Sequence, residues 1–232
     1  MKCITTLAFD MFGTVLDPAG SLTPPLSRFL TQKCSSVDGA TLWAHWRDRQ
    51  RIEQYQDALL MLGHSGYLET CRRALVYCLR GNGVEFTHDD VDDLMRSWHE
   101  LIPFEDAVEA LKRLGGRYRL VALSNGERWF LEHLARNRIK FSFDAIISVE
   151  EAGSFKPHPS VYRTAARILE SEPHEIMMVA AHSFDVMGAR ACGYRGAFVN
   201  RYGLPFEETP YQPDITVDDF YQLASHLLEE ER

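Results

Sequence analysis

Strand-like and helix-like segments alternate from residue 107 to the C-terminal part of this chain. Short apolar runs are followed by longer segments whose apolar residues recur at helical spacing. Such alternation predicts βαβ crossovers and an α/β fold, a parallel sheet with helices on both faces. The expected strands are 118–123, 145–148, 176–180 and 196–199, and the expected helices are 107–114, 128–136, 160–169, 186–192 and 219–231.

An earlier strand precedes this alternation and ends in an acid. Residues 3–9 form an apolar run of strand length, which stops at Asp10. Ligands bind beyond the carboxyl ends of strands in open parallel sheets, so Asp10 is placed where chemistry is expected. Gly13 lets backbone approach a substrate closely, and Thr14 offers a hydroxyl. From these residues alone, Asp10 could equally cap a helix after the strand.

A helical segment separates the first strand from the rest of the sheet. From residue 17 to about residue 100, Leu, Val and Trp recur at helical spacing. Gly-containing breaks at 63–66 and 81–83 divide this stretch, and Thr87 begins a helix with acids in its first turn. The expected division is a Rossmann-like core, residues 1–16 and 104–232, and an inserted helical domain, residues 17–103.

Composition narrows the class of protein. The chain has 232 residues, 45% of them hydrophobic, which suits one large domain or two unequal ones. A net charge of -8 argues against a nucleic-acid partner. We see no signal peptide and no apolar stretch of about 18 residues, and therefore expect a soluble, cytoplasmic protein without a membrane partner. The five cysteines have no metal-like spacing and are expected to be reduced thiols.

Three later stretches share the polar character of the first strand's end. Ser124-Asn125-Gly126 follows strand 118–123, Lys156-Pro157 lies in a tight loop, and His182-Ser183-Phe184-Asp185 follows strand 176–180. With Asp10, their order and spacing resemble the haloacid dehalogenase superfamily over nearly the whole chain. The sequence Asp10-Met11-Phe12-Gly13-Thr14 resembles the L-2-haloacid dehalogenase (type II) branch rather than the phosphatases.

The resemblance implies an activity and a mechanism. Asp10 would act as the nucleophile that displaces halide from C2 of a short, anionic 2-haloalkanoic acid, and water would then cleave the aspartyl ester. Attack from behind the halogen inverts C2, so an L-2-haloacid would give a D-2-hydroxyacid. The helical insert would be a cap domain that closes over the active site. The preferred halogen is not defined by the sequence, although an apolar wall could admit fluoride.

Two positions separate dehalogenation from phosphatase chemistry. Phosphatases of the superfamily usually carry a second Asp two residues after the nucleophile, and this chain has Phe12 there, which transfers no proton. Halide leaves without protonation, and Phe12 would form an apolar wall beside a carbon–halogen group. Ala181 stands where the phosphatase pattern has an acid that helps to hold magnesium. We therefore predict no metal and no other cofactor.

The resemblance also assigns roles to further residues. Lys156 would pair with Asp185 and neutralise Asp10, and Thr14 belongs to the same catalytic group. Ser124 and Asn125 would bind the substrate carboxylate and the departing halide. Further residues expected to contact substrate or halide are Met11, Phe12, Arg47, Tyr162 and Phe184.

Several of these assignments have open alternatives. Ser124-Asn125-Gly126 is also a common turn or cap, and a Lys-Pro on a surface loop is commonly solvated. Arg47 resembles the family arginine that reaches the leaving halide, but Arg49 and Arg51 are close in sequence, and a solvated helix face is a further alternative. Tyr162 could instead be a packing residue on a helix. Phe12 could simply pack beneath the cap.

The chain departs from the best-known family pattern in its fourth motif. Residues 180–185 stand where the family pattern reads Ser-Ser-Asn-x-x-Asp. Ala180 takes the place of the first serine, and His182 takes the place of the asparagine. Imidazole can accept a proton from water, so His182 is either the base for ester hydrolysis or a neutral hydrogen-bonding substitute. Ser183 stands at a different position and cannot be assumed to replace the missing hydroxyl.

Other functions remain as alternatives to dehalogenation. A magnesium-dependent phosphatase conflicts with Phe12 and Ala181. A hydrolase that opens a strained ring by the same displacement shares every motif. A binding protein without enzymatic activity should have lost Asp10 or Lys156, and both are present. A homodimer is expected by resemblance alone.

Overall fold

The computed structural model describes residues 4–61 and 63–229 and divides the chain into two compact units. We call residues 1–16 and 103–232 the core unit and residues 17–102 the helical unit. This division assigns Pro103 to the core unit, one residue away from the boundary expected from the sequence. Cys3, the start of the expected first strand, and residues 230–231 of the expected last helix lie outside the described residues.

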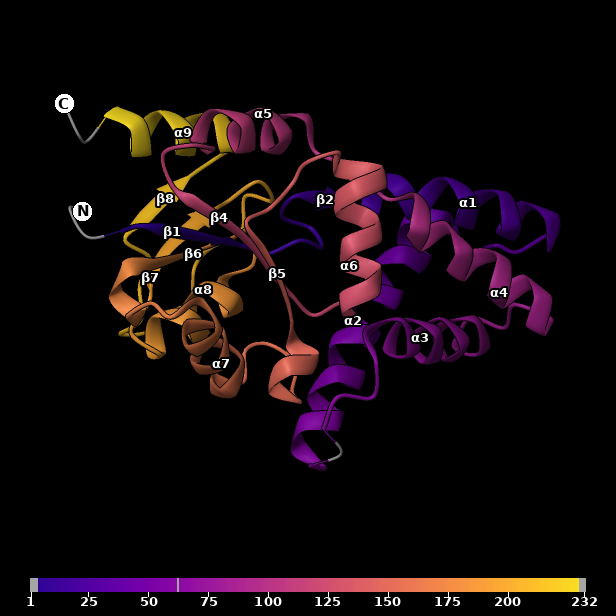
Figure 1. Cartoon of the computed structure of the whole chain (residues 1–232). Helices are drawn as coiled ribbons and strands as arrows, with labels where there is room; N and C mark the ends of the chain where they lie inside the picture. The colour runs from indigo at the N-terminus through magenta and orange to yellow at the C-terminus, as the bar shows by residue number, and fades with distance from the viewer. Residues whose placement is uncertain (1–3, 62, 230–232) are drawn as a thin grey trace. The chain divides into compact units, whose positions relative to one another are not determined.

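The core unit contains a parallel sheet, as predicted. Its strand order is β5-β4-β1-β6-β7-β8, and each neighbouring pair is parallel (Figure 1). The order reverses at β1, which pairs with β4 on one side and β6 on the other. The strands are β1 (Thr6–Phe9), β4 (Arg119–Ser124), β5 (Ala145–Ser148), β6 (Ile176–Ala180), β7 (Arg195–Val199) and β8 (Ile215–Val217).

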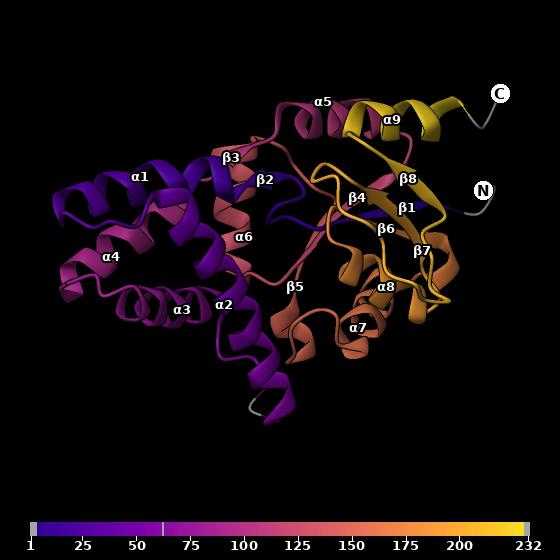
Figure 2. The same cartoon turned by 180° about the vertical axis from the view of Figure 1, so that it is seen from behind.

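Helices cover both faces of this sheet. Helices α5 and α9 lie side by side on one face, and α7 and α8 lie on the other (Figures 1 and 2). The α/β class predicted from the alternation is therefore confirmed. The helices of the core unit are α5 (Glu105–Leu114), α6 (Arg128–Leu134), α7 (Pro159–Leu169), α8 (Ser183–Ala191) and α9 (Phe220–Glu229), with shorter turns at η2 (Ala135–Ile139), η3 (Val149–Ala152) and η4 (Pro173–Glu175).

The central strand β1 is buried on both faces, which explains why it reads as a continuous apolar run. Leu7, Ala8 and Phe9 are fully buried, and the ring of Phe9 stacks on Phe220 of α9. Burial of this kind is typical of strands in parallel sheets. The first residue after β1 is Asp10, which therefore lies at the carboxyl edge of the sheet, where the strand order reverses.

The main differences between the structure and the elements expected from the sequence are at strand β8, at the start of helix α8 and at the end of helix α6. Strand β8 was not expected, because Ile215–Val217 is only three residues long and follows a proline-containing loop. Helix α8 begins at Ser183, three residues before the expected start. Helix α6 ends at Leu134 and continues as a π-turn, so the expected helix 128–136 is regular only in part.

The helical unit consists mainly of helices, in agreement with the spacing of its apolar residues. Thr87 forms the predicted N-terminal cap, since its side chain and that of Asp90 satisfy each other's backbone N–H groups. The helices are α1 (Pro18–Gln32), α2 (Gly39–Leu59), α3 (Tyr67–Gly81), α4 (His88–Arg96) and η1 (Ser97–Glu100). Two strands of two residues each, β2 (Leu16–Asp17) and β3 (Ile102–Pro103), pair where the chain passes between the units.

Aromatic side chains form the core of the helical unit. The ring of Trp98 lies edge-to-face against Trp46 at 5.7 Å and against Tyr67 at 5.6 Å. Such edge-to-face pairs add to the stability that burial of large rings provides. Within the described residues, no helix is long and apolar enough to span a membrane.

Helix α2 is not a simple amphipathic helix. Its polar residues Glu53 and Asp57 are buried, whereas Ile52 and Leu59 are exposed. Arg73 of α3 contacts both buried acids, which compensates their charge. The apolar spacing in this stretch correctly indicates a helix, but it does not define the buried face.

Candidate active site

Asp10 begins a tight loop at the end of β1. Its backbone N–H donates to the carbonyl oxygen of Val179 in β6, which extends the sheet pairing by one residue. The next carbonyl, that of Met11, accepts N–H groups from residues 14–16, and Gly13 has a φ of +90°. Glycine adopts this φ without the steric cost of a side chain. The loop therefore returns sharply and leaves the Asp10 side chain 10% exposed.

Three side chains contact the Asp10 carboxylate. Thr14 Oγ1 donates to Asp10 Oδ2 at 2.8 Å, while Lys156 Nζ lies 3.5 Å from Asp10 Oδ1. His182 Nδ1 lies 3.4 Å from Asp10 Oδ2. The Thr14 hydroxyl also accepts the backbone N–H of Ala181 at 3.0 Å, which fixes its orientation. The sequence stretches that contain Asp10, Lys156 and His182 therefore meet around one carboxylate.

Lys156 connects two acids and the end of β4. Its Nζ donates to Asp185 Oδ2 at 2.7 Å and to the carbonyl oxygen of Leu123 at 2.5 Å, and the residue is 2% exposed. Its backbone N–H donates to Asn125 Oδ1 at 2.9 Å. The lysine predicted to lie in a loop is thus buried, with its ammonium group held in a fixed position between Asp10 and Asp185.

Tyr162 supplies a further donor to this network. Its hydroxyl donates to Asp185 Oδ1 at 2.7 Å, and burial raises the pKa of Tyr162 well above its usual value. Tyr162 is therefore a neutral donor rather than a side chain that only packs. Burial raises the pKa of Asp185 to about 6, while Lys156 and Tyr162 oppose this increase.

The surroundings of Asp10 favour its charged form. Burial alone would raise its pKa, but Lys156, His182 and Thr14 outweigh burial and hold the pKa well below its usual range. An ionised carboxylate at the edge of a sheet, whose orientation is fixed by a hydrogen bond from Thr14, is suited to nucleophilic attack.

His182 is the N-cap residue of α8 and lies beside two aromatic rings. Its ring centroid is 5.5 Å from that of Phe184 and 6.1 Å from that of Tyr202. A Cβ atom placed on Gly13 would approach the His182 ring to 2.7 Å, so the imidazole packs directly on the Gly13 backbone. The position predicted to hold or activate water therefore lies beside Asp10.

The end of β4 presents a buried hydroxyl. Ser124 is fully buried, and its Oγ has no hydrogen-bond partner among the described protein atoms. A buried hydroxyl without a partner is costly unless a bound molecule satisfies it. Asn125 uses its Oδ1 to accept the Lys156 backbone N–H.

Met11 and Phe12 are buried next to Asp10. The ring of Phe12 stacks on Phe130 of α6 at 5.8 Å, and it lies so close to Gly126 that a Cβ there would approach it to 3.0 Å. Phe12 therefore has a packing role, and it supplies an apolar surface beside Asp10 rather than a second carboxylate.

Arg47 belongs to the helical unit. It lies on α2 and donates from its Nη1 to Gln50 Oε1 at 2.7 Å. Arg49, one of the sequence alternatives, forms an ion pair with Glu53 and lies over the ring of Tyr77.

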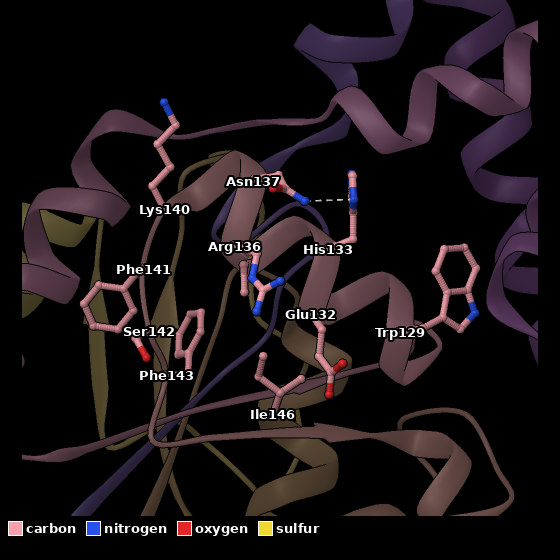
Figure 3. A pocket seen from close by; sticks show the side chains of 11 residues that line it. Trp129, Glu132, His133, Arg136, Asn137, Lys140, Phe141, Ser142, Phe143 and Ile146 are labelled. Atoms are coloured by element: carbon pink, nitrogen blue, oxygen red, sulfur yellow. Dashed lines mark hydrogen bonds between the residues drawn. The ribbon is translucent and has the colours of Figure 1, made fainter.

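Sequence reasoning missed two residues that contact the loop carrying Asp10. Arg201 and Tyr202 follow β7 and bind backbone carbonyls of the loop. A hollow elsewhere on the core unit, beside α6 and η2, contains none of the predicted site residues; Trp129, Arg136, Asn137 and Lys140 are among those that line it (Figure 3). The described residues contain no group of three or more His, Cys, Asp or Glu arranged to hold a metal ion.

Comparisons with known proteins define the family. The model of the haloacid dehalogenase-like hydrolases matches residues 4–193. Haloacetate dehalogenase H-2 from Moraxella sp. (strain B) is 31% identical over 94% of this chain and 95% of its own length. An (S)-2-haloacid dehalogenase from Xanthobacter autotrophicus is 31% identical over 85% of this chain and 76% of its own length.

A solved structure agrees with these sequence matches. The L-2-haloacid dehalogenase from Xanthobacter autotrophicus with chloropropionic acid covalently bound has a TM-score of 0.83 and 26% identity, covering 97% of this chain and 99% of its own. The chain belongs to the haloacid dehalogenase-like hydrolases, and within them to the L-2-haloacid dehalogenases. The resemblance found in the four motifs is therefore confirmed.

Proposed function

We propose that this hydrolase removes halide from short 2-haloalkanoic acids and produces 2-hydroxyalkanoic acids with inversion at C2. The observation that carries the proposal is the buried Asp10 carboxylate, which is held ionised by Lys156 and His182 and has an apolar neighbour, Phe12, in place of a second acid. The names of the relatives support a carbon–halide bond as the bond that breaks.

The first step is displacement at carbon. An oxygen of Asp10 attacks C2, the carbon–halogen bond breaks, and the halide leaves with the bonding electrons. Lys156 balances the charge of the carboxylate before attack, and Asp185 and the carbonyl oxygen of Leu123 keep its ammonium group in place. The halide needs no proton, which agrees with the absence of an acid at Phe12.

The second step is hydrolysis of the aspartyl ester. A water oxygen adds to the Asp10 carbonyl carbon, and the bond from that carbon to the oxygen joined to C2 breaks. That oxygen, which came from Asp10, leaves with C2 and takes up a proton to become the hydroxyl of the product, while the water oxygen stays in the regenerated carboxylate. His182 is the group beside Asp10 that can take the water proton at an imidazole nitrogen. C2 keeps all its bonds in this step, so the inversion from the first step remains in the product.

Substrate binding is proposed for residues near the strand ends and on α2. The unpartnered Oγ of Ser124, with Asn125, binds the substrate carboxylate, while Met11, Phe12 and Phe184 provide apolar contact. Arg47 is assigned to the leaving halide because a guanidinium stabilises developing negative charge. Halide release by Arg47→Met, compared with Arg49→Met and Arg51→Met, tests that assignment.

The proposed reaction needs no metal ion or organic cofactor. Ala181, at the position where phosphatases have a metal-binding acid, contributes only its backbone N–H, which binds Thr14. Fluoroacetate is included among the proposed substrates, because the buried ring of Phe12 forms a tight apolar wall that suits a small halogen.

The proposed working form is a cytoplasmic homodimer. The C-terminal part of α2 and the residues after it expose apolar side chains, with Leu59 82% and Met61 91% exposed. Burial of such a patch against a second copy would remove it from water. Light scattering should give a dimer mass for the wild type and a monomer mass for Leu59→Glu combined with Met61→Glu. Leu204→Glu, at an exposed leucine of the core unit, is the matched control, and a monomeric wild type contradicts the dimer.

The central experiment measures halide release with a chelator present. Wild type and Asp10→Asn are compared on L-2-chloropropionate, D-2-chloropropionate and fluoroacetate. Release by the wild type from the L-acid, with D-lactate as product, supports the proposal, and Asp10→Asn should release none. A single turnover in ¹⁸O-labelled water should place the label in Asp10 first. No release from any haloacid would overturn the proposed function.

A further inference from the structure

The turn after β7 binds the nucleophile loop through two neighbouring side chains. Tyr202 donates its hydroxyl to the carbonyl oxygen of Gly13 at 2.8 Å. Arg201 donates from its Nη2 to the carbonyl oxygen of Thr14 at 3.3 Å. Two consecutive residues of one turn thus bind two consecutive carbonyls of the loop that carries Asp10.

Arg201 anchors this turn to the body of the core unit. Its Nη2 pairs with Asp106 Oδ2 at 3.1 Å, and its guanidinium lies 3.8 Å above the ring of Phe104. Asp106 also accepts the backbone N–H of Phe220, at the start of α9. The position of Tyr202 is therefore set by its neighbour, which is held by α5 and α9.

Tyr202 also contacts His182. The two ring centroids lie 6.1 Å apart, and a Cβ on Gly13 would lie 2.7 Å from His182 and 3.2 Å from the Tyr202 hydroxyl oxygen. Gly13, His182 and Tyr202 thus form one tightly packed group. The hydroxyl of Tyr202 is fixed by Gly13, so its ring restricts the positions open to the imidazole.

We propose that Tyr202 is a positioning residue that holds the His182 imidazole toward Asp10 for hydrolysis of the aspartyl ester. The assignment rests on the proposed function and adds a residue to its second step. Carbon–halogen displacement needs Asp10, which Thr14 and Lys156 hold directly. Proton transfer from water needs the imidazole at a fixed distance, because such transfer requires hydrogen-bond contact. Loss of Tyr202 should therefore slow the second step and spare the first.

The test separates the two steps by rapid mixing with L-2-chloropropionate. Wild type, Tyr202→Phe and Tyr202→Leu are followed for halide release, and intact mass measures the ester on the protein. Tyr202→Leu should release about one halide per site at the wild-type rate and then turn over about 10- to 100-fold more slowly, a smaller loss than the roughly 10²- to 10⁴-fold ascribed to general acid–base catalysis, because the imidazole itself remains. Tyr202→Phe, which keeps the ring but loses the hydroxyl, should be intermediate.

Tyr211 provides the matched control. It lies in the same loop and has the same exposed fraction as Tyr202, 43%, so Tyr211→Leu removes an equally exposed ring. A double-mutant cycle gives a second readout: with His182 already changed to Ala, Tyr202→Leu should cause no further loss, because residues that act through one group are non-additive.

Each outcome has a defined meaning. A burst and slow turnover that are confined to the Tyr202 variants support the assignment. An equal loss in the burst and in turnover means that Tyr202 only supports the nucleophile loop, and unchanged turnover removes any role; both overturn the inference while leaving the proposed function intact. Absence of halide from the wild type overturns the proposed function itself, and the assignment with it.

Discussion

Lys156 Nζ lies 2.7 Å from Asp185 Oδ2, and both side chains are 1% exposed. The same ammonium group is farther from Asp10, the proposed nucleophile, at 3.5 Å from its Oδ1. Asp185 therefore acts as the fixed partner that keeps the lysine in place, while Asp10 retains an oxygen that is less tightly bound. A nucleophile needs this arrangement, because a carboxylate paired closely with a cation attacks less readily.

Lys156→Met should abolish most activity and destabilise the core unit. Removing one partner of a buried ion pair leaves the other charge uncompensated, at a cost of about 3–5 kcal/mol. Chemical denaturation measures this loss, and halide release measures activity. The double variant Lys156→Met/Asp185→Asn should regain part of the stability and none of the activity. Lys140→Met, at an exposed lysine, should match the wild type in both assays. Full activity of Lys156→Met would show that the lysine has no catalytic part.

The rate of halide release should decline on the acid side of its pH profile, and the pKa of Asp185 should set the position of this acid limb. Burial raises the pKa of Asp185 to about 6, so this carboxylate takes up a proton as the pH falls through that value. Lys156 then has Asp10 as its only charged acid partner in the network, and attack by Asp10 slows. The pKa of Asp10 is held well below its usual range, so Asp10 itself stays ionised there.

Tyr162→Phe tests the origin of that limb. The Tyr162 hydroxyl lowers the pKa of Asp185, so its removal should move the limb to higher pH, by up to about one unit. Tyr194→Phe is the control, because Tyr194 is buried against Tyr162 and donates to its carbonyl oxygen instead. The rate of the halide burst is measured from pH 5 to 8. A limb that stays in place in Tyr162→Phe, or that moves equally in Tyr194→Phe, contradicts the assignment to Asp185.

His182→Ala should trap the aspartyl ester. The first step needs no base, so one halide per site should appear, after which turnover should fall by about 10²- to 10⁴-fold. Intact mass before and after mixing detects the ester on Asp10. His133→Ala, at a histidine on α6 outside the site, should behave as the wild type. Unchanged turnover in His182→Ala would remove the base role and leave His182 as a neutral substitute for asparagine.

The sequence predicted the sheet and the convergence of its strand ends, since both follow from local patterns. An apolar run such as Leu120–Leu123 indicates a strand that is buried on both faces of the sheet. Residues that follow parallel strands lie at the same edge of that sheet. Strand β8 was missed because Ile215–Val217 is too short to show a period.

Residues that act through tertiary contact leave no such pattern. Tyr202 lies in a loop that reads as surface, and its bond to the carbonyl of Gly13 joins residues that are far apart in sequence. From the sequence alone, Glu53 and Asp57 would be placed on the solvent-facing side of α2. Their burial depends on a compensating partner, Arg73, which comes from another helix. The spacing of apolar residues indicates whether one segment is a helix or a strand, whereas these contacts depend on the neighbouring elements.

Ser124→Ala should weaken substrate binding without destabilising the protein. The Ser124 Oγ is buried and has no partner among the described protein atoms, so removing it breaks no protein hydrogen bond and relieves an unsatisfied group. If this hydroxyl binds the substrate carboxylate, KM for L-2-chloropropionate should rise about 10-fold or more, as expected for a hydrogen bond to a charged group. Steady-state kinetics and thermal unfolding measure the two effects.

Ser148→Ala is the matched control for this substitution. Ser148 is equally buried at the end of the neighbouring strand β5, but its hydroxyl donates to the carbonyl oxygen of Gly126 at 2.7 Å. Its loss should lower the melting temperature because it leaves a buried carbonyl with one partner fewer, and it should leave KM close to the wild-type value. The opposite pattern, in which Ser124→Ala lowers stability and leaves KM unchanged, would place the Ser124 hydroxyl in the fold rather than in the substrate site.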